Sequence, residues 1–415
     1  VRRLALAGAA HGATVLPGQD VASYKQLSLQ ELMNLEVTSV SRRSEKLTEA
    51  ASAVQVITGE DIRRSGATNL PEALRLAPNL QVAQVNASQW AISARGFNNV
   101  LANKLLVLID GRTVYTPLYA GVFWDVQDTF LADIDRIEVI SGPGGTLWGA
   151  KAVNGLINLV TKSSKETQGL FAEGSSGDEL NPLLAVRYGG RIAPRLHYRV
   201  YAKTSERDST QSLDGSDAGD EWDMDQGGFR MDWDPRDEDL VTLQADIYEA
   251  RPNPDGAVAV KAKGRNVLGR WTRTLGSGAD FNLQVYYDYT LRDFGNGFTE
   301  ALDTWDFDSQ HRFFVGDRHE IVWGLGARSM MHKVTNLPLF GFSPGDRRLT
   351  LFSAFVQDEI TFFDDRLRLT LGSKFEHNDF TGVEIQPSVR AAWIPIEGHT
   401  LWAAVSRGVR TPARI

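Results

Sequence analysis

The chain has 415 residues, a formal net charge of −8 and no cysteine. The acidic balance argues against a nucleic-acid-binding domain, which is normally basic, and the lack of cysteine excludes disulfides and thiolate metal sites. No run of about 18 apolar residues predicts a transmembrane helix, although strands that alternate lipid-facing and lumen-facing residues remain compatible with the negative mean hydropathy.

Residues 1–27 are predicted to be a signal-peptide remnant followed by a linker. Two arginines precede a short stretch of small apolar residues, as in an export signal, and residues 14–27 carry Gly, Pro, Gln and Ser without periodicity. A disordered tail is the alternative, because the apolar stretch is short for a complete signal.

Residues 28–45 contain a short helical pattern and then a β-prone pentapeptide. The pentapeptide consists of Glu36, Val37, Thr38, Ser39 and Val40. An extended segment of this kind can add a strand to a partner through its free backbone groups. It can equally be the first strand of the domain that follows.

Residues 46–165 are predicted to form a small α+β domain. Thr58 with Asp61 three residues later predicts the capped start of a helix, and Asn69 followed by Pro71 predicts the start of a second one. Asp110-Gly111 is a strong turn signal after an apolar strand. Strands are expected at residues 54–57, 92–96, 105–110 and 137–140.

The segment from Asp133 to Lys162 combines a strand, a glycine-rich turn and a second strand. Glycine-rich turns can expose N–H groups to a phosphate, but the Lys-Ser/Thr of a P-loop and the GxGxxG spacing are both missing. Bends or a close approach of the backbone are the other explanation for the glycines.

Alternating strands are predicted throughout residues 166–415. From Asp280 to Arg292 apolar and polar side chains occupy opposite faces, and Arg366 to Glu376 repeats the pattern. A soluble β-sandwich would also alternate, so alternation alone does not identify a barrel. Aromatic residues near strand ends favour a barrel, because they suit the two bilayer interfaces. They include Trp305, Trp323, Phe362, Phe363 and Trp402.

No arrangement of residues in the sequence predicts catalysis. The seven histidines are scattered, without an HExxH motif or a close pair at ligand spacing, and no GxSxG motif occurs. Acidic pairs such as Asp364-Asp365 fall where turns are expected. We therefore predict a protein that is not an enzyme and that has neither a metal centre nor a cofactor.

Several motifs between residues 35 and 162 resemble those of TonB-dependent outer-membrane receptors. They are LEVTSVSRR from Leu35, LPEALRLAPNLQV from Leu70, ISARGF from Ile92, LVLIDGR from Leu106 and the segment from Asp133 to Lys162. They occur in the order that is typical of the family. Ser141 departs from the family pattern, which often has an arginine before the Gly-Pro pair.

The resemblance implies an α+β plug domain followed by an antiparallel transmembrane β-barrel in the bacterial outer membrane. A barrel of this class closes with about 22 strands, whereas residues 166–415 supply about a dozen alternating segments. The chain also ends without the terminal aromatic residue that such barrels usually carry. We therefore expect an incomplete barrel, truncated near its middle.

The resemblance also implies active import of a large nutrient chelate. The expected ligand is a ferric siderophore, with cobalamin second, and the expected partner is TonB with its inner-membrane energising complex. The protein would be surrounded by outer-membrane lipid, and no nucleic acid is expected. A passive or adhesive outer-membrane barrel and a soluble β-rich carbohydrate-binding or hydrolytic protein are the competing hypotheses.

Three groups of residues are predicted to carry this function. Family position makes Glu36 to Val40 the TonB box. Arg95 and Arg136 are expected to bridge the plug to barrel acids at Glu376 and Glu359, because a buried arginine must be paired. Ligand contacts are expected in the apical plug loops, with packing inside the plug or against the barrel as the alternative for each residue. These residues are Gln89, Trp90, Asn98, Asn99, Tyr115, Tyr119, Phe123 and Trp124.

Overall fold

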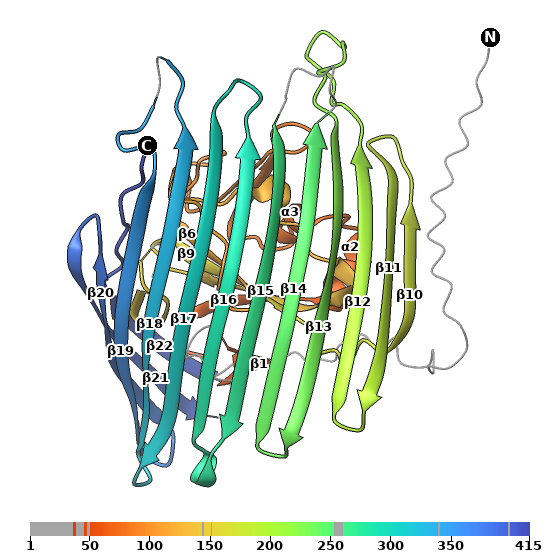
Figure 1. Cartoon of the computed structure of the whole chain (residues 1–415). Coiled ribbons are helices and arrows are strands. Elements are labelled where there is room, and N and C mark those ends of the chain that lie inside the picture. The colour runs from red at the N-terminus through yellow and green to blue at the C-terminus, as the bar shows by residue number, and fades with distance from the viewer. Residues whose placement is uncertain are drawn as a thin grey trace.

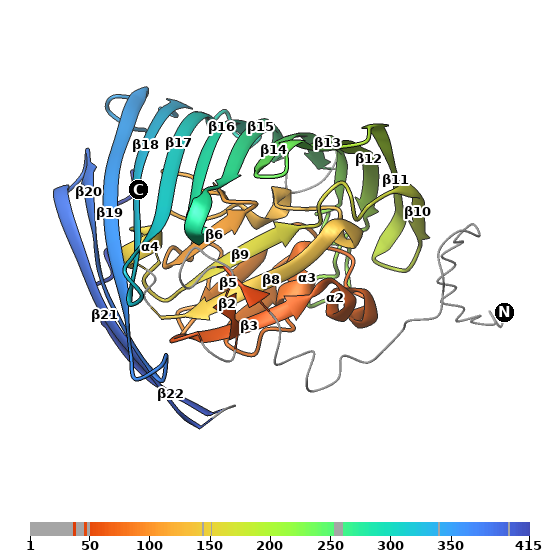
Figure 2. The same cartoon turned by 90° about the horizontal axis from the view of Figure 1, so that it is seen from below.

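A computed structural model describes residues 36–38, 45–47, 50–142, 145–150, 152–252, 260–338, 341–396 and 399–415. Two bodies share this structure, a small α+β plug and a 13-stranded antiparallel sheet that curves around one side of it (Figures 1 and 2). The predictions for residues 1–27, for Ser39 and for Val40 lie outside the described residues.

The plug is built on a five-stranded mixed sheet with strand order β3-β8-β9-β6-β7, in which only β6 and β9 are parallel. A second sheet pairs β4 with β5, and β1 pairs with β2. The strands are β1 (Glu36–Val37), β2 (Glu45–Lys46), β3 (Ala53–Thr58), β4 (Leu80–Gln84), β5 (Trp90–Ala94), β6 (Leu105–Ile109), β7 (Arg112–Thr113), β8 (Ile134–Ser141) and β9 (Gly155–Thr161).

Capping residues set the starts of the first two plug helices, as predicted. The helices are α2 (Gly59–Ser65), α3 (Leu70–Leu74) and α4 (Gly145–Trp148), with short 3-10 turns η2 (Trp124–Val126) and η3 (Leu131–Asp133). Thr58 and Asp61 form a reciprocal capping box, in which each side chain accepts the backbone N–H of the other residue. Asn69 accepts the N–H of Glu72 at 2.9 Å, and Pro71 lies in the first turn.

The plug has its own hydrophobic core on both faces of the mixed sheet. One face packs against α2, α3 and β5 through residues that include Ile62, Leu74, Ile92 and Ile137. The other face forms a smaller cluster around Leu156, to which Val37 contributes from β1. Both clusters consist of plug residues alone, so the plug has a hydrophobic core of its own.

The large sheet is a meander in which each strand pairs with its sequence neighbours. Among the described residues, β10 and β22 form its two edges and are not paired with each other. Its strands are β10 (Gly169–Ser175), β11 (Leu180–Ala193), β12 (Leu196–Arg207), β13 (Trp222–Arg236), β14 (Asp239–Pro252), β15 (Lys261–Thr274), β16 (Asp280–Asp293), β17 (Thr299–Val315), β18 (His319–Thr335), β19 (Arg347–Phe362), β20 (Leu367–Asn378), β21 (Gly382–Ile396) and β22 (His399–Ser406).

Alternation of inward and outward residues follows the sequence pattern. On β16, Gln284 and Arg292 are buried on the plug side, whereas Val285 between them points outward and is exposed. β20 repeats this arrangement with Glu376 inward and Phe375 outward. The two rims of the sheet differ in the length of their connections (Figure 1). One rim has short turns such as residues 194–195, and the other has longer loops such as residues 208–221.

Two details differ from the sequence-based expectation. Trp305 lies well inside β17 rather than near a strand end, and β20 begins at Leu367 because residues 363–365 form a turn with positive φ angles. No helix among the described residues is both long and apolar enough to cross a membrane.

Candidate functional site at the plug–sheet interface

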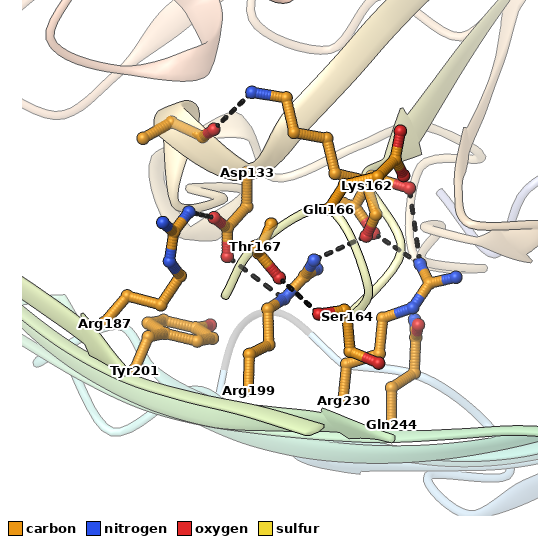
Figure 3. Close-up of polar contacts among 12 residues, drawn as sticks. Asp133, Lys162, Ser164, Glu166, Thr167, Arg187, Arg199, Tyr201, Arg230 and Gln244 are labelled. Carbon is orange, nitrogen blue, oxygen red and sulfur yellow. Dashed lines mark hydrogen bonds and ion pairs between the residues drawn. The ribbon is translucent and has the colours of Figure 1, made fainter. Parts of the chain in front are cut away.

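A buried acid at the base of the plug is clamped by two arginines of the sheet. Asp133, at the end of η3, is 2% exposed. Its carboxylate accepts a hydrogen bond from Arg187 of β11. Arg199 Nε of β12 lies 3.1 Å from the other carboxylate oxygen, Oδ2, and forms an ion pair with it, although the two groups are not aligned for a hydrogen bond. Figure 3 shows both guanidinium groups pointing at Asp133. The buried acid is thus neutralised from the sheet, and it fixes the plug to β11 and β12.

The connection between plug and sheet is pinned by a third arginine. Arg230 of β13 donates to Thr161 Oγ1 at 2.9 Å and also pairs with Asp232 two residues further along the same strand. Asp232 accepts the N–H of Ser164 at 2.6 Å. These contacts hold the chain where it leaves β9 and enters β10 (Figure 3).

The Asp110-Gly111 turn also serves the interface. Asp110 accepts the N–H and the hydroxyl of Thr161, each at 2.8 Å, and Arg270 of β15 donates to its backbone carbonyl. Burial alone would raise the pKa of the Asp110 carboxyl, but Arg230 and the bonds from Thr161 outweigh burial and hold that pKa below its ordinary value. Gly111 has φ +81°, and a Cβ there would lie 2.9 Å from the Gln284 side chain. The turn thus needs glycine for its backbone angle and for the close contact.

The plug loop after β7 is held by a second set of charges. Arg292 of β16 binds Asp125 through both terminal nitrogens, at 2.7 and 2.9 Å, and its guanidinium lies 3.9 Å from the centre of the Phe123 ring. Lys203 of β12 pairs with Asp128 of the same loop. A bidentate pair with a stacked arginine fixes both the position and the orientation of this loop.

A cavity of about 380 Å³ lies between the plug and strands β15 to β20, next to the Asp110-Gly111 turn. Its lining is rich in charged groups from both bodies, and it reaches the segment that contains Thr38. The charged lining residues are Asp110, Arg136, Arg270, Asp306, Asp308, Arg328, Lys374 and Glu376. Among the described residues, no group of three His, Asp or Glu side chains is arranged to hold a metal ion.

The described part of the predicted TonB box is docked on the plug. Val37 is fully buried against the β8–β9 face of the plug sheet. The N–H of Thr38 donates to both carboxylate oxygens of Glu138, each at 3.1 Å, and its hydroxyl donates to one of them at 3.2 Å. The segment therefore occupies a defined position rather than hanging free.

The predicted ligand residues divide into an exposed and a buried group. Gln89, Asn98 and Asn99 are exposed, and both asparagine amides bond to nearby backbone carbonyls. Trp90 and Trp124 belong to the plug core instead. For these two tryptophans the structure supports packing, because the surrounding core leaves their rings almost no surface for a ligand.

The remaining predicted ligand residues fill the space between plug and sheet. Tyr119 is 4% exposed and packs with Phe298 and Val334, while Phe123 lies beneath Arg292. Tyr115 packs against a cluster of Leu302, Met330 and Leu349. Their aromatic surface is used for plug–sheet packing.

The predicted arginine bridges to barrel glutamates are wrong in their partners. Arg136 pairs within the plug, with Asp135 at 2.6 Å and Glu138 at 2.7 Å, and Arg95 is exposed, with no ion pair to a described acid. Glu376 is buried on the plug side of β20, but it accepts the backbone N–H of Ala150 at 2.8 Å. Glu359 is half-buried, and Thr370 on the neighbouring strand donates to it at 3.4 Å.

The residues that carry the interface were not among the predicted site residues. A usable signal was present, because Arg187, Arg199, Arg230 and Arg292 occupy inward positions of alternating strands. Inward arginines predict acids on whatever fills the interior. The plug acids Asp133 and Asp125 fulfil that expectation, because they pair with Arg187 and Arg292.

These features define a curved antiparallel β-sheet that holds a separate plug domain, which is the architecture of a plugged outer-membrane barrel. Residues 46–156 match the TonB-dependent Receptor Plug Domain, and residues 161–414 match the TonB dependent receptor-like, beta-barrel domain. The chain belongs to the TonB-dependent receptor family, which places it in the outer membrane.

Curated relatives and solved structures agree with this assignment. The Vitamin B12 transporter BtuB of Vibrio vulnificus is 30% identical over 145 residues, which cover 34% of this chain and 23% of that protein. The Iron-regulated outer membrane virulence protein of Vibrio cholerae is 23% identical over 406 residues, or 91% of this chain and 60% of that protein. The structure of the siderophore receptor PirA from Pseudomonas aeruginosa has a TM-score of 0.67 at 20% identity, covering 86% of this chain and 62% of that one. The chain thus spans less than two thirds of the length of these proteins.

Proposed function

We propose that this chain serves TonB-dependent active import of a large nutrient chelate, with a ferric siderophore as the first candidate. The support for a siderophore is the likeness of the fold to the siderophore receptor PirA. Cobalamin is the second candidate, because a relative at 30% identity over 145 residues is named a vitamin B12 transporter.

The observation that carries the proposal is the way in which the plug is held. Its contacts with the sheet include buried pairs of opposite charge at Asp133 and Asp125, and a half-buried pair between Arg112 and Asp288. Leaving one charge of such a pair buried without its partner costs about 3–5 kcal/mol, so we expect the plug to stay docked while no force acts on it. Import of a ligand past the plug therefore needs work, and TonB supplies that work by pulling on the segment from Glu36 to Val40. This segment acts as a switch between an ordered and a disordered state.

The ligand is proposed to land on the exposed part of the plug loops. Gln89, Asn98 and Asn99 offer amides there, and Phe97 is 84% exposed beside them. Amides next to an aromatic ring suit a bulky ligand with polar edges and apolar faces.

A deletion strain tests the proposal when it is grown on a panel of ferric chelates and on cobalamin. The receptor is expected to restore growth on one ligand, and the double substitution Val37→Pro and Val40→Pro is expected to abolish uptake while binding persists. Uptake that survives both prolines would remove the TonB-box assignment. Conductance of the purified receptor in planar bilayers without any ligand would instead favour a passive barrel.

A further inference from the structure

Glu138 is a carboxylate in the middle of the plug sheet, where a charged residue needs an explanation. It lies on β8, where it pairs with Val56 of β3 on one side and Asn158 of β9 on the other. The side chain is 0% exposed, and its strand neighbours Ile137 and Val139 belong to the hydrophobic core. A buried charge of this kind persists only when it is paired and hydrogen-bonded.

Its partners include one residue of its own strand and one residue of the segment that TonB is proposed to pull. Arg136 Nε lies 2.7 Å from Oε1 on the same strand face, two residues away. Thr38 supplies its N–H to both oxygens at 3.1 Å and its hydroxyl at 3.2 Å. Arg136 reaches that same hydroxyl at 3.4 Å. Hydrogen bonds to a charged acceptor are about twice as strong as neutral ones.

The surroundings also provide a way for these bonds to break. Thr38 and Arg136 both line the 380 Å³ cavity between plug and sheet, whereas Val37 is sealed in the apolar cluster beside them. When the segment leaves, water from the polar cavity can replace the donors of Thr38 on the carboxylate. Release is therefore possible without unfolding of the plug sheet.

We propose that Glu138 is the positioning residue that holds the TonB-box segment on the plug, through the backbone N–H and hydroxyl of Thr38. This assignment rests on the proposed import function, in which residues 36–40 are the segment that is pulled. It gives the segment a resting state whose strength depends on one buried carboxylate.

The chain has no cysteine, which allows a direct test by thiol labelling. Val37→Cys places a thiol that is shielded while the segment is docked, so its rate of reaction with a maleimide reports the released fraction. In the purified receptor, without TonB or ligand, Glu138→Gln is expected to raise that rate about tenfold, the change for losing one hydrogen bond to a charged acceptor. Thr38→Pro, which removes both the N–H and the hydroxyl that donate to Glu138, should raise it at least as much.

Glu72→Gln is the matched control. Glu72 also accepts the N–H and the hydroxyl of a threonine, Thr68, at 2.7 and 2.9 Å, but it lies on α3 away from the segment. Its substitution is expected to leave the labelling rate within about twofold of the parent.

The double variant Glu138→Gln with Thr38→Pro decides whether the two residues act through one contact. A shared contact predicts a rate no higher than the faster single variant, whereas effects that multiply would overturn the proposal. Rates near that of the control in both single variants would overturn it as well. Should Glu138→Gln fail to fold, Thr38→Pro still tests the contact by itself, because it lies outside the plug sheet. Labelling needs no transport, so a receptor that shows the predicted rates and imports nothing would refute the proposed function alone.

Discussion

Asp133→Ala is the substitution that should loosen the plug most directly. It removes the acid that joins the plug to β11 and β12, and it leaves the guanidinium groups of Arg187 and Arg199 facing each other in a buried space. Both arginine side chains are at most 10% exposed in the intact protein. Little water therefore reaches them while the plug is docked.

The size of the effect follows from what the two arginines retain. Removing one partner of a buried ion pair costs about 3–5 kcal/mol. Arg199 still donates to the carbonyl of Lys162, and Arg187 still lies 5.2 Å from the centre of the Phe171 ring. We therefore expect the lower end of that range, about 3 kcal/mol, which corresponds to roughly a hundredfold shift of the docking equilibrium.

A urea titration of the receptor in detergent, read out by proteolysis of the plug, measures this shift. Asp237→Ala is the control, because Asp237 pairs with Arg195 at the rim with exposures of 83% and 51%. Asp237→Ala should change the free energy of plug docking by no more than about 0.5 kcal/mol. If Asp133→Ala behaved like Asp237→Ala, the buried pairs would not hold the plug.

Three further substitutions or conditions test separate parts of the interface. Arg292→Lys loses the bidentate contact with Asp125 and the stacking on Phe123. The free energy that holds this loop should fall by about 1–2 kcal/mol in the same titration, and protease should cleave the loop at lower urea. Gly111→Ala should cost about 1–2 kcal/mol, because φ is +81° and the new methyl group meets Gln284; an unchanged midpoint would contradict the packing there. Folding lowers the pKa of Asp110 below its ordinary value of 3.8. Its contribution to the free energy of unfolding is therefore complete above pH 3.8 and is lost as the pH falls through the lower pKa of the folded protein. The melting temperature should therefore fall in acid, and Asp110→Asn should make that fall smaller.

Local signals in the sequence identified the plug elements well. The Thr58–Asp61 box and the Asn69 cap are properties of a few consecutive residues, and the structure confirms both. The inward and outward faces of β16 were equally readable, because a strand fixes the direction of each side chain relative to its neighbours.

Partner choice across the interface was not readable in the same way. Arg136 was expected to reach the barrel, but Glu138 two residues along the same strand face lies 2.7 Å away and satisfies it first. Trp90 was expected either to contact a ligand or to pack in the plug, and the burial of every residue of β5 supports packing. The partner of an arginine or the burial of a tryptophan depends on which other segments pack against that face of the strand, and a single sequence does not show this.

Energy coupling through the docked segment is tested by the initial rate at which cells expressing the receptor accumulate the matching chelate, with and without a functional TonB complex. We predict accumulation above the external concentration only when TonB is energised, with ligand binding at the cell surface unchanged. Equal accumulation in both kinds of cell would contradict a plug that is held by buried charges and moved by a pull on its docked segment.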